Sequence, residues 1–190
     1  MRVHEFPGII CRWLRVRTFG SRALAGVATT PDRKQAVIER LRGRERQRGI
    51  ELSPGAVPII DKDTFNVVYL DKFDHSSTDS YLNGTPVRID ALLGEKYIDE
   101  VLEHDTYAYL FSSHVIEHIP DFIQFFISAA NVLADGARLL MYVPDKRYTF
   151  DVLRSETTIA QIEEAYRQRL RHPSRDMVMD WYKGVDLRKV

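Results

Sequence analysis

The most informative segment of this chain is Asp105 to Asp151, DTYAYLFSSHVIEHIPDFIQFFISAANVLADGARLLMYVPDKRYTFD. Two uncharged runs within it, Tyr107 to Phe111 and Leu139 to Val143, predict strands that are buried on both faces of a parallel sheet. Between them, Phe122 to Leu133 is apolar over more than one narrow stripe, which predicts a crossover helix that Asp135-Gly136 ends. A strand, a helix and a strand joined in this way predict a βαβ unit, whose ligands bind at the carboxyl ends of the strands.

The segment before this unit adds further strands. Ile50 to Pro58 predicts a very short strand that breaks into a turn of small residues and proline. Asn66 to Leu70 predicts a second strand, and Pro86 to Ile89 a third, which is followed by the acid Asp90. Because several of these strands end in acidic or polar residues, we expect one extended polar ligand at the switch point of the sheet.

Three helices are predicted outside the βαβ unit. The first begins at Thr29 or Thr30 and runs through an arginine-rich end until Gly49 stops it. The second begins after a cap at Thr157 or Thr158, and the third covers Met177 to Lys183. We therefore divide the chain into a basic arm and helix (1–48), an α/β core (49–151) and a helical segment (152–190).

The charges are distributed unevenly along the 190 residues, although the net charge is zero. Residues 1–48 contain 12 Lys and Arg against 4 Asp and Glu, and the remainder has the opposite excess. Such a basic arm either binds an anionic surface or folds back on the acidic body, and the neutral total favours the second. The arginine-rich run lacks interleaved aromatic residues, which weighs against a nucleic-acid partner.

The sequence has neither a run that could span a membrane nor a pair of cysteines that could form a disulfide. No apolar run approaches the roughly 18 residues that a membrane-spanning helix needs. The single cysteine, Cys11, leaves no intramolecular disulfide framework and fits a reducing compartment. We therefore expect a soluble, cytoplasmic protein.

A resemblance to a known family is carried by five segments in order, which are IELSPGAVP, VVYLD, VRIDA, FSSHVIEHIPD and LADGARLLMYVPDKRYTFD. Their order and spacing resemble the class I S-adenosylmethionine-dependent methyltransferases, in particular the methyltransferase type 11 group. The resemblance covers Ile50 to about Ser174 and implies a Rossmann-like, mostly parallel sheet flanked by helices. Relatives associated with glycan genes suggest a small-molecule or glycan-type acceptor.

The resemblance implies that S-adenosylmethionine binds to the turns after the strands. Asp71 matches the acid that accepts hydrogen bonds from the ribose hydroxyls, which suits a carboxylate because it offers only acceptors. Asp90 with Ala91 matches the segment near the adenine. The implied cofactor-binding residues are Glu51, Ser53, Pro54, Gly55, Asp71, Asp90, Ala91, Ser112, Ser113 and His114.

The first turn departs from the family pattern. An acid followed by G-x-G is usual there, whereas Glu51 is followed by Ser53, Pro54 and Gly55. Glycine lets a backbone approach a ligand closely, but serine is small and proline holds a fixed turn. We expect weakened rather than abolished cofactor binding.

Methyl transfer needs an aligned acceptor and, for some acceptors, a base. His114 and His118 are the candidate bases, and the sequence does not choose between them. The candidate substrate-binding residues follow the fifth strand and are Asp145, Lys146, Arg147 and Tyr148. His114 to His118 also fits the H-x-x-E-H zinc signature, but a strand before it and Pro120 after it disfavour the single helix that this motif requires, so we predict no metal site.

Class I methyltransferases usually add two more strands after the fifth, and only helical segments follow Val143 in this sequence. An uncovered edge strand invites association, so we expect a homo-oligomer formed through the open sheet edge. The sequence thus predicts an S-adenosylmethionine-dependent methyltransferase. The alternative is a methyltransferase-like module that has lost catalysis and serves in binding or assembly.

Overall fold

The structure, a computed structural model, describes residues 30–55, 57–74 and 87–185. Five strands in these ranges form one sheet in the order β3-β2-β1-β4-β5, and all neighbouring pairs are parallel. The strands are β1 (Gly49–Leu52), β2 (Val67–Asp71), β3 (Ala91–Leu92), β4 (Tyr107–Ser113) and β5 (Leu133–Tyr142). The chain runs outward from β1 to β3 and then from β4 to β5, so the switch point lies between β1 and β4.

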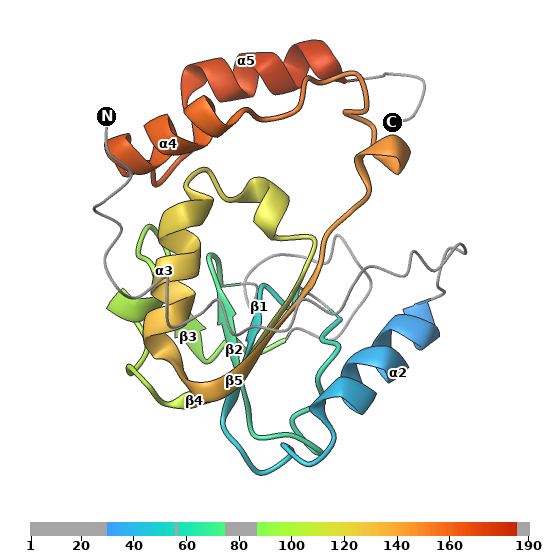
Figure 1. The fold of residues 1–190 in the computed structure, drawn as a ribbon. Coiled ribbons are helices and arrows are strands. Elements are labelled where there is room, and N and C mark those ends of the chain that lie inside the picture. The colour runs from blue at the N-terminus through green and yellow to red at the C-terminus, as the bar shows by residue number, and fades with distance from the viewer. Residues whose placement is uncertain (1–29, 56, 75–86, 186–190) are drawn as a thin grey trace.

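Helices flank this sheet, which confirms the predicted α/β, Rossmann-like fold class (Figure 1). The α-helices are α2 (Thr30–Leu41), α3 (Phe122–Val132), α4 (Ile159–Gln168) and α5 (Arg175–Gly184), and three short 3-10 helices are η2 (Ile98–Glu100), η3 (Ile116–His118) and η4 (Lys146–Tyr148). The helices that the structure describes include none with the length and apolar character to cross a membrane.

The sheet has a buried core on each face because successive side chains of a strand point to opposite sides. Ile50 and Leu52 of β1 pack in one cluster with Phe125 of α3. Tyr109 of β4 packs in the other cluster with Leu41 of α2. Figure 1 shows α2 and α3 on opposite sides of the sheet. The two apolar faces therefore place one helix on each side of the central strands.

Gly49 opens β1 where the backbone passes closely over a buried ring. A Cβ added at Gly49 would overlap the ring of Tyr109, which is completely buried and packs edge-on against Phe65 with ring centroids 6.4 Å apart. A side chain at position 49 thus has no space, and the glycine is required by this close approach.

The third predicted strand was placed wrongly. Of the predicted range, Pro86 lies outside the described residues and 87–89 form no strand, whereas Ala91–Leu92 pairs with β2. The carboxylate of Asp90 accepts a hydrogen bond from the backbone N–H of Tyr69 at 2.8 Å. Asp90 therefore occupies the ladder position just before the strand, and does not stand at the carboxyl end of a strand.

Two predicted helix ends were also wrong. The first helix ends at Leu41, not near Gly49, because residues 42–48 offer no apolar side chain to the core and Gly43 takes a left-handed φ of 81°. The crossover helix ends at Val132, and Asp135 and Gly136 lie within β5. An irregularity in the pairing of β4 with β5, between Tyr107 and Tyr109, accommodates these extra residues.

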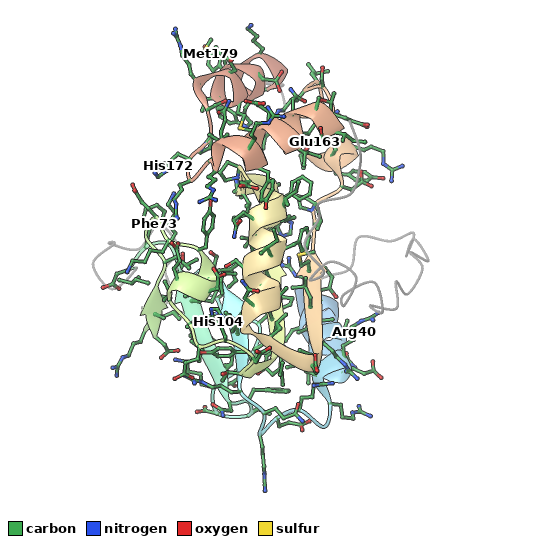
Figure 2. The ribbon with its side chains drawn as sticks, turned by 60° about the vertical axis from the view of Figure 1, so that its left-hand side comes forward. Arg40, Phe73, His104, Glu163, His172 and Met179 are labelled. Carbon is green, nitrogen blue, oxygen red and sulfur yellow. The ribbon has the colours of Figure 1, made fainter. Side chains whose placement is uncertain are left out.

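Both C-terminal helices were predicted, although α5 begins two residues before the predicted Met177 and ends one residue after Lys183. Thr158 caps α4 by accepting from the backbone N–H of Gln161, and Ser174 caps α5 in the same way. Both helices lie beyond one end of the sheet, and Figure 2 places Glu163 and Met179 at the end of the molecule opposite Arg40 and His104.

The strand β5 forms one edge of the sheet within the described ranges, and helices rather than strands follow it there. Its residues 139–142 are only half-buried, and Val143 after it is exposed. Association through this edge stays a prediction, since an edge strand offers unpaired backbone groups to a second chain.

Candidate functional site

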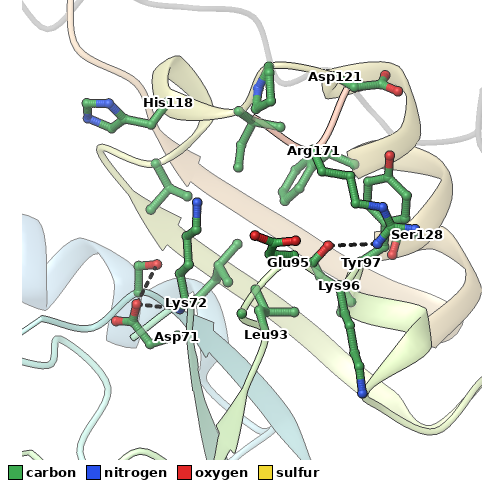
Figure 3. Close-up of a pocket in the computed structure, with 18 of the residues that line it drawn as sticks. Asp71, Lys72, Leu93, Glu95, Lys96, Tyr97, His118, Asp121, Ser128 and Arg171 are labelled. Carbon is green, nitrogen blue, oxygen red and sulfur yellow. Dashed lines mark hydrogen bonds between the residues drawn. The ribbon is translucent and has the colours of Figure 1, made fainter. Parts of the chain in front are cut away.

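The first of two adjoining cavities lies at the carboxyl ends of β1, β2 and β4. Its volume is about 460 Å³, and its walls include Asp71 from the end of β2, Leu93 after β3 and Val115 after β4. Arg171, between α4 and α5, also lines it. In Figure 3, Asp71 and Lys72 lie on one side of this first cavity, and Tyr97, Ser128 and Arg171 lie on the other. A cavity of this size at the switch point fits a small-molecule ligand.

A second cavity of about 620 Å³ opens on the α2 side of the same strand ends. It is lined by Arg33 and Lys34 of α2, by Glu51 and by Ser113. The residues that line both cavities are Leu52, Ser53 and His114. The two cavities therefore meet where β1 and β4 end.

Each of the two strands at this junction is followed directly by a residue in the left-handed conformation. Ser53 has a φ of 52° and His114 has a φ of 56°, which is uncommon for residues other than glycine. Backbone hydrogen bonds hold them, from Ser53 to the Leu70 carbonyl at 2.7 Å and from His114 to the Tyr142 carbonyl at 2.9 Å. Ser53 thus adopts, without being glycine, the conformation that a glycine turn would supply.

Asp71 is buried at the end of β2 and its orientation is fixed. One carboxylate oxygen accepts from the backbone N–H of Lys72 at 2.6 Å and lies 3.4 Å from the hydroxyl of Ser53. Asp71 lines the first cavity, and its role as an acceptor for ribose hydroxyls stays a prediction.

Glu51 lies on the other face of β1, beside the second cavity and not the first. Its two oxygens accept from the backbone N–H groups of Ile59 and Ile60, each at 2.8 Å. Burial raises the pKa of the Glu51 carboxyl to about 7, although the two N–H donors act in the opposite direction. Glu51 therefore holds the loop after β1 against the sheet.

The segment predicted near the adenine is only partly brought to the site. Asp90 and Ala91 line neither cavity, and the ammonium of Lys62 donates to the Asp90 carboxylate at 2.7 Å. The residues that follow β3, Leu93 and Gly94, line the first cavity in their place. The signal in the sequence was Gly94 itself, a glycine two residues after the strand, and in the structure it takes a left-handed φ of 55°. This glycine could have indicated that the turn after the strand lines the site.

Ser113, His114 and Arg33 form a polar group at the junction. A guanidinium N–H of Arg33 donates to the Ser113 hydroxyl at 3.1 Å, and His114 Nδ1 lies 3.0 Å from that hydroxyl. Ser112 is buried within β4 and lines neither cavity. The sequence did not predict the contact of Arg33 with Ser113, because the sequence of a basic helix does not show which strand end its arginines will contact.

The two histidines that the sequence predicted as bases differ in position. His114 lines both cavities, whereas His118 lines the first only, and both side chains are exposed to solvent. They do not share a helix, since His114 follows β4 directly and η3 begins at Ile116. The part of the chain that the structure describes contains no cluster of three His, Cys, Asp or Glu suited to a metal ion.

The predicted substrate-binding residues Asp145, Lys146, Arg147 and Tyr148 line neither cavity. The guanidinium of Arg147 pairs with the carboxylate of Asp145 at 2.5 Å, and this hydrogen bonding lowers the pKa of Asp145 to about 2. Tyr148 is 79% exposed. Their role in acceptor binding stays a prediction.

The far wall of the first cavity contains polar groups that sequence reasoning missed. The Tyr97 hydroxyl and one Asp121 oxygen are buried and have no hydrogen-bond partner among the described residues. Burial raises the pKa of both groups, and Asp121 adds to the effect on Tyr97. Arg171 stacks over the Tyr97 ring at 4.1 Å and pairs with Glu100 at 2.6 Å. The C-terminal segment thereby closes this side of the cavity.

These features define a Rossmann-like α/β domain with two adjoining cavities at its switch point. No protein-family profile matches the sequence, and no curated protein is significantly similar to it. Among solved structures, phosphoethanolamine N-methyltransferase 2 of Haemonchus contortus in complex with S-adenosyl-L-methionine is similar, with 15% identity and a TM-score of 0.42. The match covers 80% of this chain and 36% of that one.

Two further structures are similar to the same extent. A complex of that Haemonchus enzyme with phosphomonomethylethanolamine and S-adenosylhomocysteine has 16% identity and a TM-score of 0.44, over 80% of this chain and 36% of the other. The CurJ carbon methyltransferase has 12% identity and a TM-score of 0.42, over 80% of this chain and 44% of the other. The chain therefore spans less than half the length of these methyltransferases.

Proposed function

We propose that this protein is an S-adenosylmethionine-dependent methyltransferase that acts on a small-molecule or glycan-type acceptor. The observation that carries the proposal is the meeting of two cavities at Ser53 and His114, with the buried carboxylate of Asp71 facing the first. A two-part site of this kind suits a reaction in which a cofactor and an acceptor bind side by side.

The residues of the first cavity fit the cofactor. Asp71 offers a carboxylate to the ribose hydroxyls, and Leu93 and Val115 offer apolar walls to a flat adenine ring. Ser53 takes the left-handed turn beside them without a glycine. S-adenosylmethionine supplies an activated methyl group when bound. The chain's own task is then to orient the acceptor and to exclude water.

His114 is the candidate general base of this site. Its imidazole lines both cavities, and Nδ1 lies 3.0 Å from the hydroxyl of Ser113. An acceptor hydroxyl or amine that gains a methyl group must lose a proton, and a neutral imidazole at the junction can take it. Ser113 orients the ring for this transfer.

Calorimetric titration with S-adenosylmethionine and S-adenosylhomocysteine tests the proposal. Binding of both ligands at micromolar concentration, about −8 kcal/mol, is the expected result. A folded protein that gives no heat with either ligand would refute the cofactor assignment.

The second candidate function is a methyltransferase-like module without catalysis, which serves in binding or assembly. Two observations favour it: Ser53 and Pro54 stand in the turn where the family has glycines, and β5 is an edge strand within the described ranges. Failure to bind either adenosyl ligand, together with a dimer in light scattering, would support this second function.

A further inference from the structure

We propose that the second cavity binds an anionic group of the acceptor, a phosphate or a carboxylate, through Arg33 and Lys34. This inference rests on the proposed function and deepens it by naming the class of acceptor. It starts from the placement of α2, which brings two successive basic residues to the rim of the cavity that adjoins His114.

The charges around this cavity favour an anion. Arg33 and Lys34 are its cations, and Glu51 is the one carboxylate among its described lining residues. Both oxygens of Glu51 already accept backbone N–H groups. Burial also raises the pKa of that carboxyl to about 7, which reduces its negative charge near neutral pH. The remaining lining is apolar or neutral, apart from His114, so the cavity is cationic overall.

Arg33 is held in place rather than freely extended. Its guanidinium donates to the Ser113 hydroxyl at 3.1 Å and lies 3.5 Å from His114 Nδ1. Among the residues with described side chains, no carboxylate lies within ion-pair distance of Arg33 or Lys34. A guanidinium offers parallel donors that match a phosphate or carboxylate, and its partly fixed position reduces the entropy lost on binding.

Arg147, one of the two cations that the sequence predicted for acceptor binding, is already paired with a carboxylate. Arg147 donates from Nε and from a terminal nitrogen to Asp145, and neither residue lines a cavity. Arg33 and Lys34 instead lie beside the junction. An anion bound there would place the rest of the acceptor next to His114, where the methylated atom has to lie.

The test uses the full chain saturated with S-adenosylhomocysteine and titrated with inorganic phosphate or phenyl phosphate. We expect saturable binding that Arg33→Gln weakens by about tenfold or more, as loss of a charge-assisted hydrogen bond predicts. Arg40→Gln is the matched control, because it removes the same charge from the other end of α2. It should bind the phosphate probes like the parent protein.

A bound anion could instead be the carboxylate of the cofactor itself. Binding of S-adenosylhomocysteine and of methylthioadenosine, which lacks that carboxylate, separates the two sources. Arg33→Gln should leave both affinities unchanged. Selective loss of S-adenosylhomocysteine binding would overturn the acceptor assignment, as would phosphate binding that is absent or equal in Arg33→Gln and the parent. If the parent binds phosphate through Arg33 but no adenosyl ligand, the anion site stands and the methyltransferase proposal fails.

Discussion

The hydroxyl of Ser53 lies 3.4 Å from the carboxylate of Asp71, and this contact joins the ends of β1 and β2 beside the first cavity. Backbone hydrogen bonds from Lys72 and Phe73 to the same oxygen hold the carboxylate in one orientation. The adenosyl ligand of the proposed function would therefore meet a preorganised acceptor, although Ser53 and Pro54 and not glycines follow β1.

Replacement of Asp71 by asparagine should weaken S-adenosylhomocysteine binding by about 1 to 3 kcal/mol, because the amide keeps one acceptor and loses the other. Calorimetric titration measures the difference. Asp63→Asn is the matched control, since Asp63 is exposed and lines neither cavity. Equal affinities of the parent and Asp71→Asn would remove Asp71 from the cofactor site.

The buried Glu51 should make the stability of the protein depend on pH. Its pKa is raised from 4.5 to about 7 in the folded state by burial, so the folded state binds the proton more tightly than the unfolded state. The contribution is fully present below pH 4.5 and is lost as the pH rises through about 7. The loss should be on the order of 3 kcal/mol.

Urea unfolding at a series of pH values measures this dependence. Glu51→Gln should flatten the curve between these two pH values, because the amide does not titrate. The variant should also lose some stability at low pH, since its NH₂ group faces one of the two N–H donors of Ile59 and Ile60. Identical pH curves for the two proteins would show that another group is responsible.

Replacement of His114 by asparagine should lower kcat by about 10²- to 10⁴-fold for an acceptor that must lose a proton. Asparagine tolerates the left-handed backbone at this position, so the fold should persist. His118→Asn is the comparison, and it should retain more activity because His118 does not line the second cavity. A larger loss in His118→Asn would assign the base to His118.

Replacement of Gly49 by alanine should lower the free energy of unfolding by about 1 to 3 kcal/mol or prevent folding, because its methyl group would overlap the buried ring of Tyr109. Gly136→Ala meets no atom within 4 Å and should lose only about 1 kcal/mol to its left-handed φ. Urea unfolding of the two variants compares them. Equal losses of unfolding free energy in the two variants would mean that the ring of Tyr109 moves aside at little cost.

The sequence predicted the local elements well where burial is periodic. The runs around Tyr107 to Phe111 and Phe122 to Leu133 form β4 and α3, and Thr158, one of the two predicted caps, caps α4. It failed where long-range pairing decides the conformation. Asp90 follows the segment Pro86 to Ile89 that was predicted as a strand, but its carboxylate accepts from the backbone of Tyr69 and the side chain of Lys62 before the observed strand begins.

For the site, the order of residues along the chain was enough to place polar side chains at the strand ends, and Asp71, Ser53 and His114 all line the first cavity. The contact of Arg33 with Ser113, across 80 residues of sequence, and the stacking of Arg171 over Tyr97 come from the packing of distant segments. Hydrophobic periodicity reports on burial within a short window. Which helix covers a given strand end depends on packing between segments far apart in the chain, and no local pattern contains that information.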